Sequence, residues 1–254
     1  MIDLKKHQFL FEELVKRDFK KKYKRTVLGM GWSVLSPLLM LLVMKLVFGG
    51  LFAKDIPHYT TYLFCGLLMF QFFSESSALG MRSLMENAAI FSKINVPKYL
   101  FLLAKNVQVL INFALILAVF FVFALIDGIE FSWRLLLLPY PIVTLLAFNI
   151  GIGFILSALF IFFKDIDYLW SVALQLMMYG SAIFYRVDAL SPSLQTLFAY
   201  NPIYRHIAYV RELVIAGSIP SPSAHLILAL IAATTFALGA LVYKRTNTKF
   251  LYYV

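Results

Sequence analysis

The stretch KRDFKKKYKRTVLGMGWSVLSPL, residues 16–38, decides the fold of this chain. Seven of its first ten residues are lysine or arginine, and the apolar run that follows carries Pro37 inside it. Lysine and arginine placed directly ahead of a hydrophobic segment are retained on the cytoplasmic side of a membrane. The stretch therefore predicts a membrane protein whose first spanning helix follows a basic cytoplasmic segment.

The overall composition is that of an integral membrane protein. Hydrophobic residues make up 61% of the 254 residues, against roughly 45–50% in soluble domains. The net charge of +10 falls between hydrophobic segments, so membrane topology and anionic lipid explain it better than nucleic acid does. A single cysteine, Cys65, excludes an internal disulfide and a cysteine-based zinc site.

Six apolar segments have about the length that a helix needs to cross a bilayer, roughly 20 residues. They are residues 33–52, 59–80, 106–126, 135–163, 168–185 and 224–243. Seventeen of the 23 lysines and arginines lie in the expected inner segments and five in the outer ones, which favours cytoplasmic positions for both termini. The expected fold class is an all-α integral membrane protein with six transmembrane helices.

Two inner segments are expected to form helices outside the spans. Residues 1–24 carry apolar side chains at helical spacing, with lysine and glutamate between them. This pattern predicts an amphipathic helix in the cytoplasmic interface, and a solvated helix is the alternative. Residues 82–97 are the longest inner loop, and Ser83 and Glu86 have the spacing of a capping box, so a short helix is expected there.

Residues 187–223, between the fifth and sixth expected spans, are too apolar for a simple loop. Ser191-Pro192 and Asn201-Pro202 each place a capping residue before a proline, which is typical of a helix start. We expect a re-entrant helical hairpin that dips into the outer leaflet. A pair of amphipathic helices lying flat on the outer surface is the alternative.

The second helix of this hairpin carries two arginines. Arg205 and Arg211 are six residues apart and point to different sides of a helix, so they need not share a partner. An unpaired arginine in hydrocarbon costs about 2.5 to 3.5 kcal/mol on insertion scales. Both side chains are therefore expected at the leaflet boundary or facing water.

The sequence gives little support for enzyme chemistry. The chain holds no G-x-x-x-x-G-K-[ST] and no H-E-x-x-H, and its four histidines are isolated. The 13 acids are scattered, so the proton relay of an ion-coupled carrier is not evident. We expect no catalytic residue, no metal site and no cofactor in this chain.

Aromatic residues are abundant, with 25 Phe, 14 Tyr and 3 Trp. Most of them are expected to face lipid or neighbouring helices, or to form an interfacial belt. Aromatic rings also stack on the apolar faces of sugar rings, so a path for a glycan would use them. The candidates for such contacts are Tyr23, Trp32, Tyr168, Trp170 and Tyr179.

Four motifs in order resemble one family. LGMGWSVLSPL at 28–38 resembles the L-G-x-x-W-x-x-L-x-P-L signature of permease subunits of polysaccharide ABC exporters, which move O-antigen or teichoic acid. FSKINVP at 91–97 is similar to that family's inner loop after span two. FKDI at 163–166 resembles its F-R-D-I turn, and YNP at 200–202 matches its Y-N-P. The ordered set covers the whole chain.

The resemblance implies a single transmembrane permease domain over residues 1–254, in a homodimer that pairs with two copies of a separate nucleotide-binding ATPase subunit. ATP and Mg²⁺ would bind to that partner, and this chain would be a transport subunit and not an enzyme. The substrate would be an undecaprenyl-diphosphate-linked polysaccharide, exported across the bacterial cytoplasmic membrane. No nucleic acid partner is implied.

Three sets of candidate residues follow. ATPase coupling is expected of Ser83, Glu86, Lys93 and Pro97, the inner turn of Lys164 and Asp165, and the outer gate of Asn201, Pro202, Arg205 and Arg211. Lys164 stands where the family has arginine, and lysine cannot reproduce a planar bidentate fork. Two other functions stay open: a drug or small-lipid ABC export permease, and a membrane enzyme or scramblase that needs no ATPase.

Overall fold

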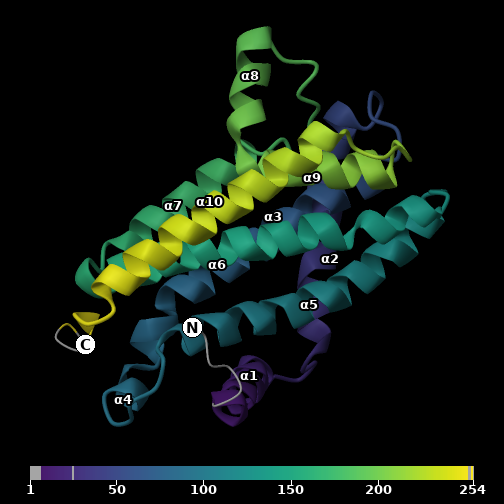
Figure 1. Cartoon of the computed structure of the whole chain (residues 1–254). Coiled ribbons are helices and arrows are strands. Elements are labelled where there is room, and N and C mark those ends of the chain that lie inside the picture. The colour runs from purple at the N-terminus through teal and green to yellow at the C-terminus, as the bar shows by residue number, and fades with distance from the viewer. Residues whose placement is uncertain (1–6, 25, 251–252, 254) are drawn as a thin grey trace.

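The computed structural model describes residues 7–24, 26–250 and 253, which form helices and, within these residues, no strand (Figure 1). The elements are α1 Gln8–Tyr23, α2 Gly31–Phe52, α3 Tyr59–Glu86, α4 Ala88–Phe91, α5 Tyr99–Ile126, the 3₁₀ helix η2 Trp133–Leu137, α6 Pro139–Phe162, α7 Ile166–Tyr179, α8 Pro192–Tyr200, α9 Pro202–Val214 and α10 Pro222–Thr246. The all-helical fold class is thus confirmed.

Within the described residues, five stretches are long and apolar enough to cross a membrane. They are Gly31–Phe52, Tyr59–Phe91, Tyr99–Ile126, Trp133–Phe162 and Pro222–Thr246. The expected span at 168–185 is not among them, because α7 has 14 residues and ends at Tyr179. At 1.5 Å per residue α7 is about 21 Å long, which is shorter than a hydrocarbon core of about 30 Å.

Helix α3 is the centre of the molecule, in contact with α2, α5, α6, α7 and α9. Its first half, Tyr59 to Phe73, is apolar on nearly every side, and most of these side chains are buried. A helix that is hydrophobic all round is one that other helices enclose. By contrast α2 exposes many apolar side chains along its length, as a helix facing lipid does.

Helices α6 and α10 pack closely because two glycines face each other. A Cβ built on Gly151 of α6 would lie 2.6 Å from the backbone carbonyl carbon of Thr235 in α10. A Cβ on Gly239 of α10 would in turn clash with the backbone of Gly151. Small residues at such crossings let two membrane helices approach backbone to backbone.

We name the two ends of the bundle by their elements. The collar end holds α1, α4 and the turn at residues 163–165, and the hairpin end holds α8 and α9 (Figure 1). Helices α8 and α9 begin at the two prolines that the sequence points to. The Asn201 side chain caps α9, because its Oδ1 accepts hydrogen bonds from the backbone N–H groups of Ile203 and Tyr204 at 2.8 and 3.2 Å.

The sequence interpretation of residues 82–97 is wrong in one respect. No helix begins at Ser83, because α3 continues through Ser83 to Glu86. The Ser83 hydroxyl donates a hydrogen bond of 2.6 Å to the carbonyl of Gly80 and so supports the end of α3. Only the four residues of α4 are helical beyond it before α5.

Helix α5 also differs from its expected bounds. It begins at Tyr99, seven residues ahead of the expected start of the third span at residue 106. Lys105, which the sequence places in an inner loop, therefore lies two turns inside α5. This earlier start brings a lysine into the protein interior and creates the need for acidic partners.

Candidate functional site

A buried ion-pair cluster joins three helices at the collar end. The Lys105 ammonium of α5 lies 3.1 Å from a carboxylate oxygen of Asp18 in α1 and 2.9 Å from one of Glu86 in α3. The side chains of Lys105 and Asp18 are only 7% and 3% exposed. Because an unpaired charge is costly at such burial, these contacts hold α1 against the ends of α3 and α5.

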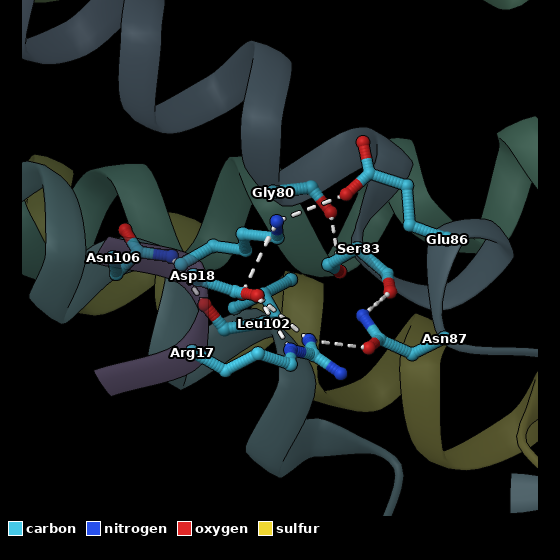
Figure 2. A network of polar contacts seen from close by, with 9 residues as sticks. Arg17, Asp18, Gly80, Ser83, Glu86, Asn87, Leu102 and Asn106 are labelled. Atoms are coloured by element: carbon cyan, nitrogen blue, oxygen red, sulfur yellow. Dashed lines mark hydrogen bonds and ion pairs between the residues drawn. The ribbon is translucent and has the colours of Figure 1, made fainter. Parts of the chain in front are cut away.

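Two further residues complete this cluster, as Figure 2 shows. The Arg17 guanidinium donates to Asp18 at 2.7 Å and to the side-chain oxygen of Asn87 at 2.7 Å. Asn87 in turn donates to the backbone carbonyl of Ser83 at 2.7 Å. We call Arg17, Asp18, Glu86, Asn87 and Lys105 the α1 latch.

The coupling candidates divide between this latch and the surface. Glu86 is a latch residue, and Ser83 is buried beneath it. Lys93 is exposed in the segment after α4, and Pro97 is half-buried at the edge of a cavity of about 420 Å³. Lys93 is thus the exposed coupling candidate that lies outside the latch, whereas Glu86 is partly exposed but paired with Lys105.

The turn between α6 and α7 is fixed to α3 by a second ion pair. Arg82 of α3 makes a bidentate contact with Asp167 of α7, with Nη2 at 2.7 and 2.9 Å from the two carboxylate oxygens. Lys164 places its ammonium 3.4 Å from the sulfur of Met85, and Asp165 is exposed ahead of α7. In this region the planar bidentate contact is therefore made by Arg82 and not by residue 164.

A cavity of about 590 Å³ opens beside the C-terminal end of α1, between α2, α3, α5 and α7. Its lining combines the Trp32 ring with the hydroxyl and amide groups of Ser74, Gln71 and Asn112. Lys22 and Glu75 also line it, and they form an ion pair at 2.5 Å. An aromatic ring beside neutral hydrogen-bonding groups is suited to a sugar.

The five aromatic candidates have different surroundings. Trp32 lines the cavity and is 43% exposed. Trp170 donates its indole N–H to the Ser77 hydroxyl at 3.1 Å and packs edge-on against Phe73. Tyr168 and Tyr179 lie exposed on α7. Tyr23 ends α1, and its side chain lies outside the described part of the structure.

At the hairpin end, Arg211 of α9 holds the segment that follows α7. Its guanidinium donates to the carbonyls of Ala182 at 2.9 Å, Ile183 at 2.8 Å and Tyr62 at 3.2 Å. The guanidinium carbon also lies 3.4 Å from the centre of the Tyr62 ring. We call these four residues the Arg211 clamp.

Of the two positions expected for Arg211, the leaflet boundary and facing water, the second does not fit, because the clamp buries the residue. The residue is 8% exposed, and backbone carbonyls of its own chain satisfy it. Arg205 is half-buried and donates to the carbonyl of Ala199 at 2.7 Å, so the two arginines do not share a partner. Asn201 adds a hydrogen bond of 2.8 Å to the carbonyl of Gly180, directly before Pro202 and α9.

Sequence reasoning missed most latch and cavity residues. Asp18 follows Leu14 by four residues, so both lie on the buried face of α1, and an acid on that face signals a partner. Glu75 lies inside an expected span, where an ionisable residue marks a candidate functional site. Lys105 and Arg82 gave no such signal, because Asp18 lies more than 80 residues from Lys105 in sequence and Asp167 more than 80 residues from Arg82.

Comparisons with known proteins agree with this architecture. Residues 10–215 match the family described as ABC-2 type transporter. The O-antigen export system permease protein RfbA of Klebsiella pneumoniae is 30% identical over 216 residues, 82% of each chain. RfbA of Myxococcus xanthus is 26% identical over 246 residues, 94% of this chain and 92% of the relative. The polysialic acid transport protein KpsM of Escherichia coli is 21% identical over 238 residues, 92% of both chains. With most of its length matched, this chain belongs to the ABC-2 type transporter family.

Proposed function

We propose that this chain is the transmembrane subunit of an O-antigen-type exporter, which moves an undecaprenyl-diphosphate-linked polysaccharide and is driven by a separate ATPase chain. The observation that carries the proposal is the cavity beside α1, which Trp32 and several neutral hydrogen-bonding residues line at the basic end of the bundle. The RfbA relatives are named for O-antigen export, which supports the same substrate class.

The collar end belongs on the cytoplasmic side in this proposal. Seven bases in residues 16–25 precede α2, two more lie in the last turn of α10, and Lys249 follows that helix. Such segments stay in the cytoplasm, so both termini lie there and the chain resides in the cytoplasmic membrane. Bases at this surface also attract the diphosphate of a lipid carrier.

The ATPase acts through the segment after α3. Lys93, exposed beyond α4, provides the contact. Movement of the α3 end is passed to α1 by the α1 latch, because Lys105 of α5 pairs with both Glu86 of α3 and Asp18 of α1. Helix α1 then displaces Lys22 at the mouth of the cavity.

Two copies of the chain form the channel. Helices α2 and α7 supply the interface, since α7 has no buried residue and α2 exposes most of its apolar side chains. The helices α8 and α9 close the far end, held by the Arg211 clamp. ATP and Mg²⁺ bind to the partner chain alone.

The test is glycan export in living bacteria. Cells that lack this chain should accumulate lipid-linked glycan inside and lose it from the surface. Restoring export should require both this chain and its ATPase, with surface glycan measured by a specific lectin or antibody. Unchanged surface glycan, together with loss of drug or small-lipid efflux, would show that the chain is a permease of the other kind.

A further inference from the structure

The cavity beside α1 is electrically balanced, as far as the described residues define its lining. Its two charged lining residues are Lys22 of α1 and Glu75 of α3. The ammonium of Lys22 lies 2.5 Å from a carboxylate oxygen of Glu75, and the two side chains are 30% and 25% exposed. The remaining polar groups that face the cavity are uncharged hydroxyls and amides, such as those of Ser74, Gln71 and Asn112.

Resting on the proposed function, we propose that this cavity binds uncharged sugar units and rejects acidic ones, so that the exported polysaccharide is neutral where it enters. The Trp32 ring offers a flat apolar face to a pyranose ring. The side chains of Gln71, Ser74 and Asn112 supply donors and acceptors for its hydroxyls. A volume of about 590 Å³ is in the range of pockets that hold small ligands.

The Lys22–Glu75 pair is what excludes an acidic sugar. A sugar carboxylate that entered the cavity would approach Glu75 directly, and like charges placed side by side are strongly unfavourable. If the sugar carboxylate paired with Lys22 instead, Glu75 would lose its partner while its side chain is only 25% exposed. Either arrangement weakens binding of an acidic unit, whereas a neutral unit leaves the pair intact.

The bases of residues 16–25 do not contradict this selectivity. Lys16, for example, is 60% exposed and pairs with Glu13 on the surface of α1. These charges attract any diphosphate carrier, whatever sugars it bears. Discrimination between sugars is made inside the cavity, where the charges of Lys22 and Glu75 cancel.

The test uses the full chain in lipid nanodiscs, with Trp133 and Trp170 replaced by phenylalanine so that Trp32 is the sole tryptophan. Its fluorescence is titrated with maltohexaose, a neutral probe, and with hexameric sialic acid, an acidic one, at the same ionic strength. We expect a saturable response to maltohexaose and at least about tenfold weaker binding of the sialic acid oligomer. Equal or tighter binding of the acidic oligomer overturns the proposal.

Two variants separate the pair from the rest of the cavity. Glu75→Gln leaves Lys22 without its acid, so the acidic oligomer should gain about tenfold or more in affinity. Lys22→Met combined with Glu75→Gln removes both charges, so the acidic oligomer should bind more tightly than to the native cavity but less tightly than to Glu75→Gln, while maltohexaose still binds. A Glu75→Gln protein that gains nothing, in nanodiscs of normal size and helix content, contradicts the role of the pair.

A further outcome distinguishes this inference from the proposed function. If Trp32 responds to neither oligosaccharide, the cavity is not a sugar site and the inference fails. The surface-glycan assay then still decides whether the chain exports polysaccharide. Loss of that export function, in contrast, would refute the proposed function whatever Trp32 reports.

Discussion

The two ends of this permease each bury a cation, and they stabilise it in different ways. At the collar end, Lys105 is neutralised by the carboxylates of Asp18 and Glu86. At the hairpin end, the contacts of Arg211 are backbone carbonyls and the face of the Tyr62 ring. The latch is thus held by charge, and the clamp by the directions of the donors on a planar fork.

This difference suggests different mechanical roles. Ion pairs between separate helices break and form again with modest changes of distance, which suits the end that we propose moves with the ATPase. A guanidinium fixed to three carbonyls of two segments holds one geometry. The hairpin end therefore has a rigid base beneath α9, and the collar end is the adjustable one.

The largest effect is expected for the clamp. Arg211→Met leaves the carbonyls of Ala182 and Ile183 without their donor, at about 1–3 kcal/mol each, and loses a cation–π contact worth about 2 kcal/mol when desolvated. The free energy of unfolding should fall by about 5 kcal/mol in Arg211→Met. Arg211→Lys should cause most of the same decrease. The measurement is the fraction of protein that stays monodisperse in detergent after heating.

Arg205→Lys is the matched control for this experiment, since Arg205 lies on the same helix with one carbonyl contact. It should change thermal stability by about 1 kcal/mol or less. Native-like stability of the Arg211→Lys protein would contradict the view that the clamp depends on a planar fork.

The second-largest effect is expected for the latch. Unlike the clamp, the latch should tolerate an exchange between lysine and arginine. Lys105→Met should cost about 3 kcal/mol, at the lower end for a broken buried pair, because Arg17 still contacts Asp18. Lys105→Arg keeps the charge between Asp18 and Glu86 and should retain most of the stability. Thermal unfolding of both variants, with the exposed Lys93→Met as control, measures this.

Function should separate the latch variants further. A complex of the proposed ATPase with the Lys105→Met chain should still hydrolyse ATP but export less glycan per ATP, because α1 no longer follows the α3 end. If Lys105→Met keeps the native ratio of export to hydrolysis, the latch is a structural feature alone.

Much of the architecture follows from local sequence. The apolar runs locate the five long helices, and the Asn201-Pro202 pair locates the start of α9, because capping and proline geometry are properties of neighbouring residues. The sequence fails at α7. This helix ends at Tyr179 because the next residues turn away, with Ala182 at a φ of 51°, and Arg211 holds them from 29 residues downstream.

The site could be predicted only in part, for the same reason. Trp32 was identified from its aromatic type and falls in the cavity. Ser83 and Glu86 have capping-box spacing, but they do not cap a helix. Glu86 pairs with Lys105 instead, and the Ser83 hydroxyl donates to the carbonyl of Gly80. A local pattern cannot reveal that a tertiary partner competes for the same side chain.

A smaller effect is expected for the second pair at the collar end. Arg82 and Asp167 form a bidentate contact but are 47% and 29% exposed, so water and salt screen it. Arg82→Gln should cost about 1 kcal/mol or less, and that difference should shrink further as salt is raised. If Arg82→Gln lost as much stability as Lys105→Met, the exposure of the two collar-end ion pairs would not explain how much each contributes.

The smallest effect is expected beside the clamp itself. Arg186 follows the clamped carbonyls by three residues and bonds to Asp188, and both side chains are about half exposed. The hydrogen bond from Arg186 lowers the pKa of Asp188. The stability from this pair is therefore present above the unfolded-state pKa, about 3.9, and is lost as pH falls through the lower folded-state pKa. At pH 7 Asp188→Asn should shift the melting temperature by no more than about 4 °C. The shift should vanish in acid, as the native carboxylate becomes protonated. A shift at pH 7 comparable to that of Arg211→Met would mean that the exposed pair, and not the buried guanidinium, fixes this segment.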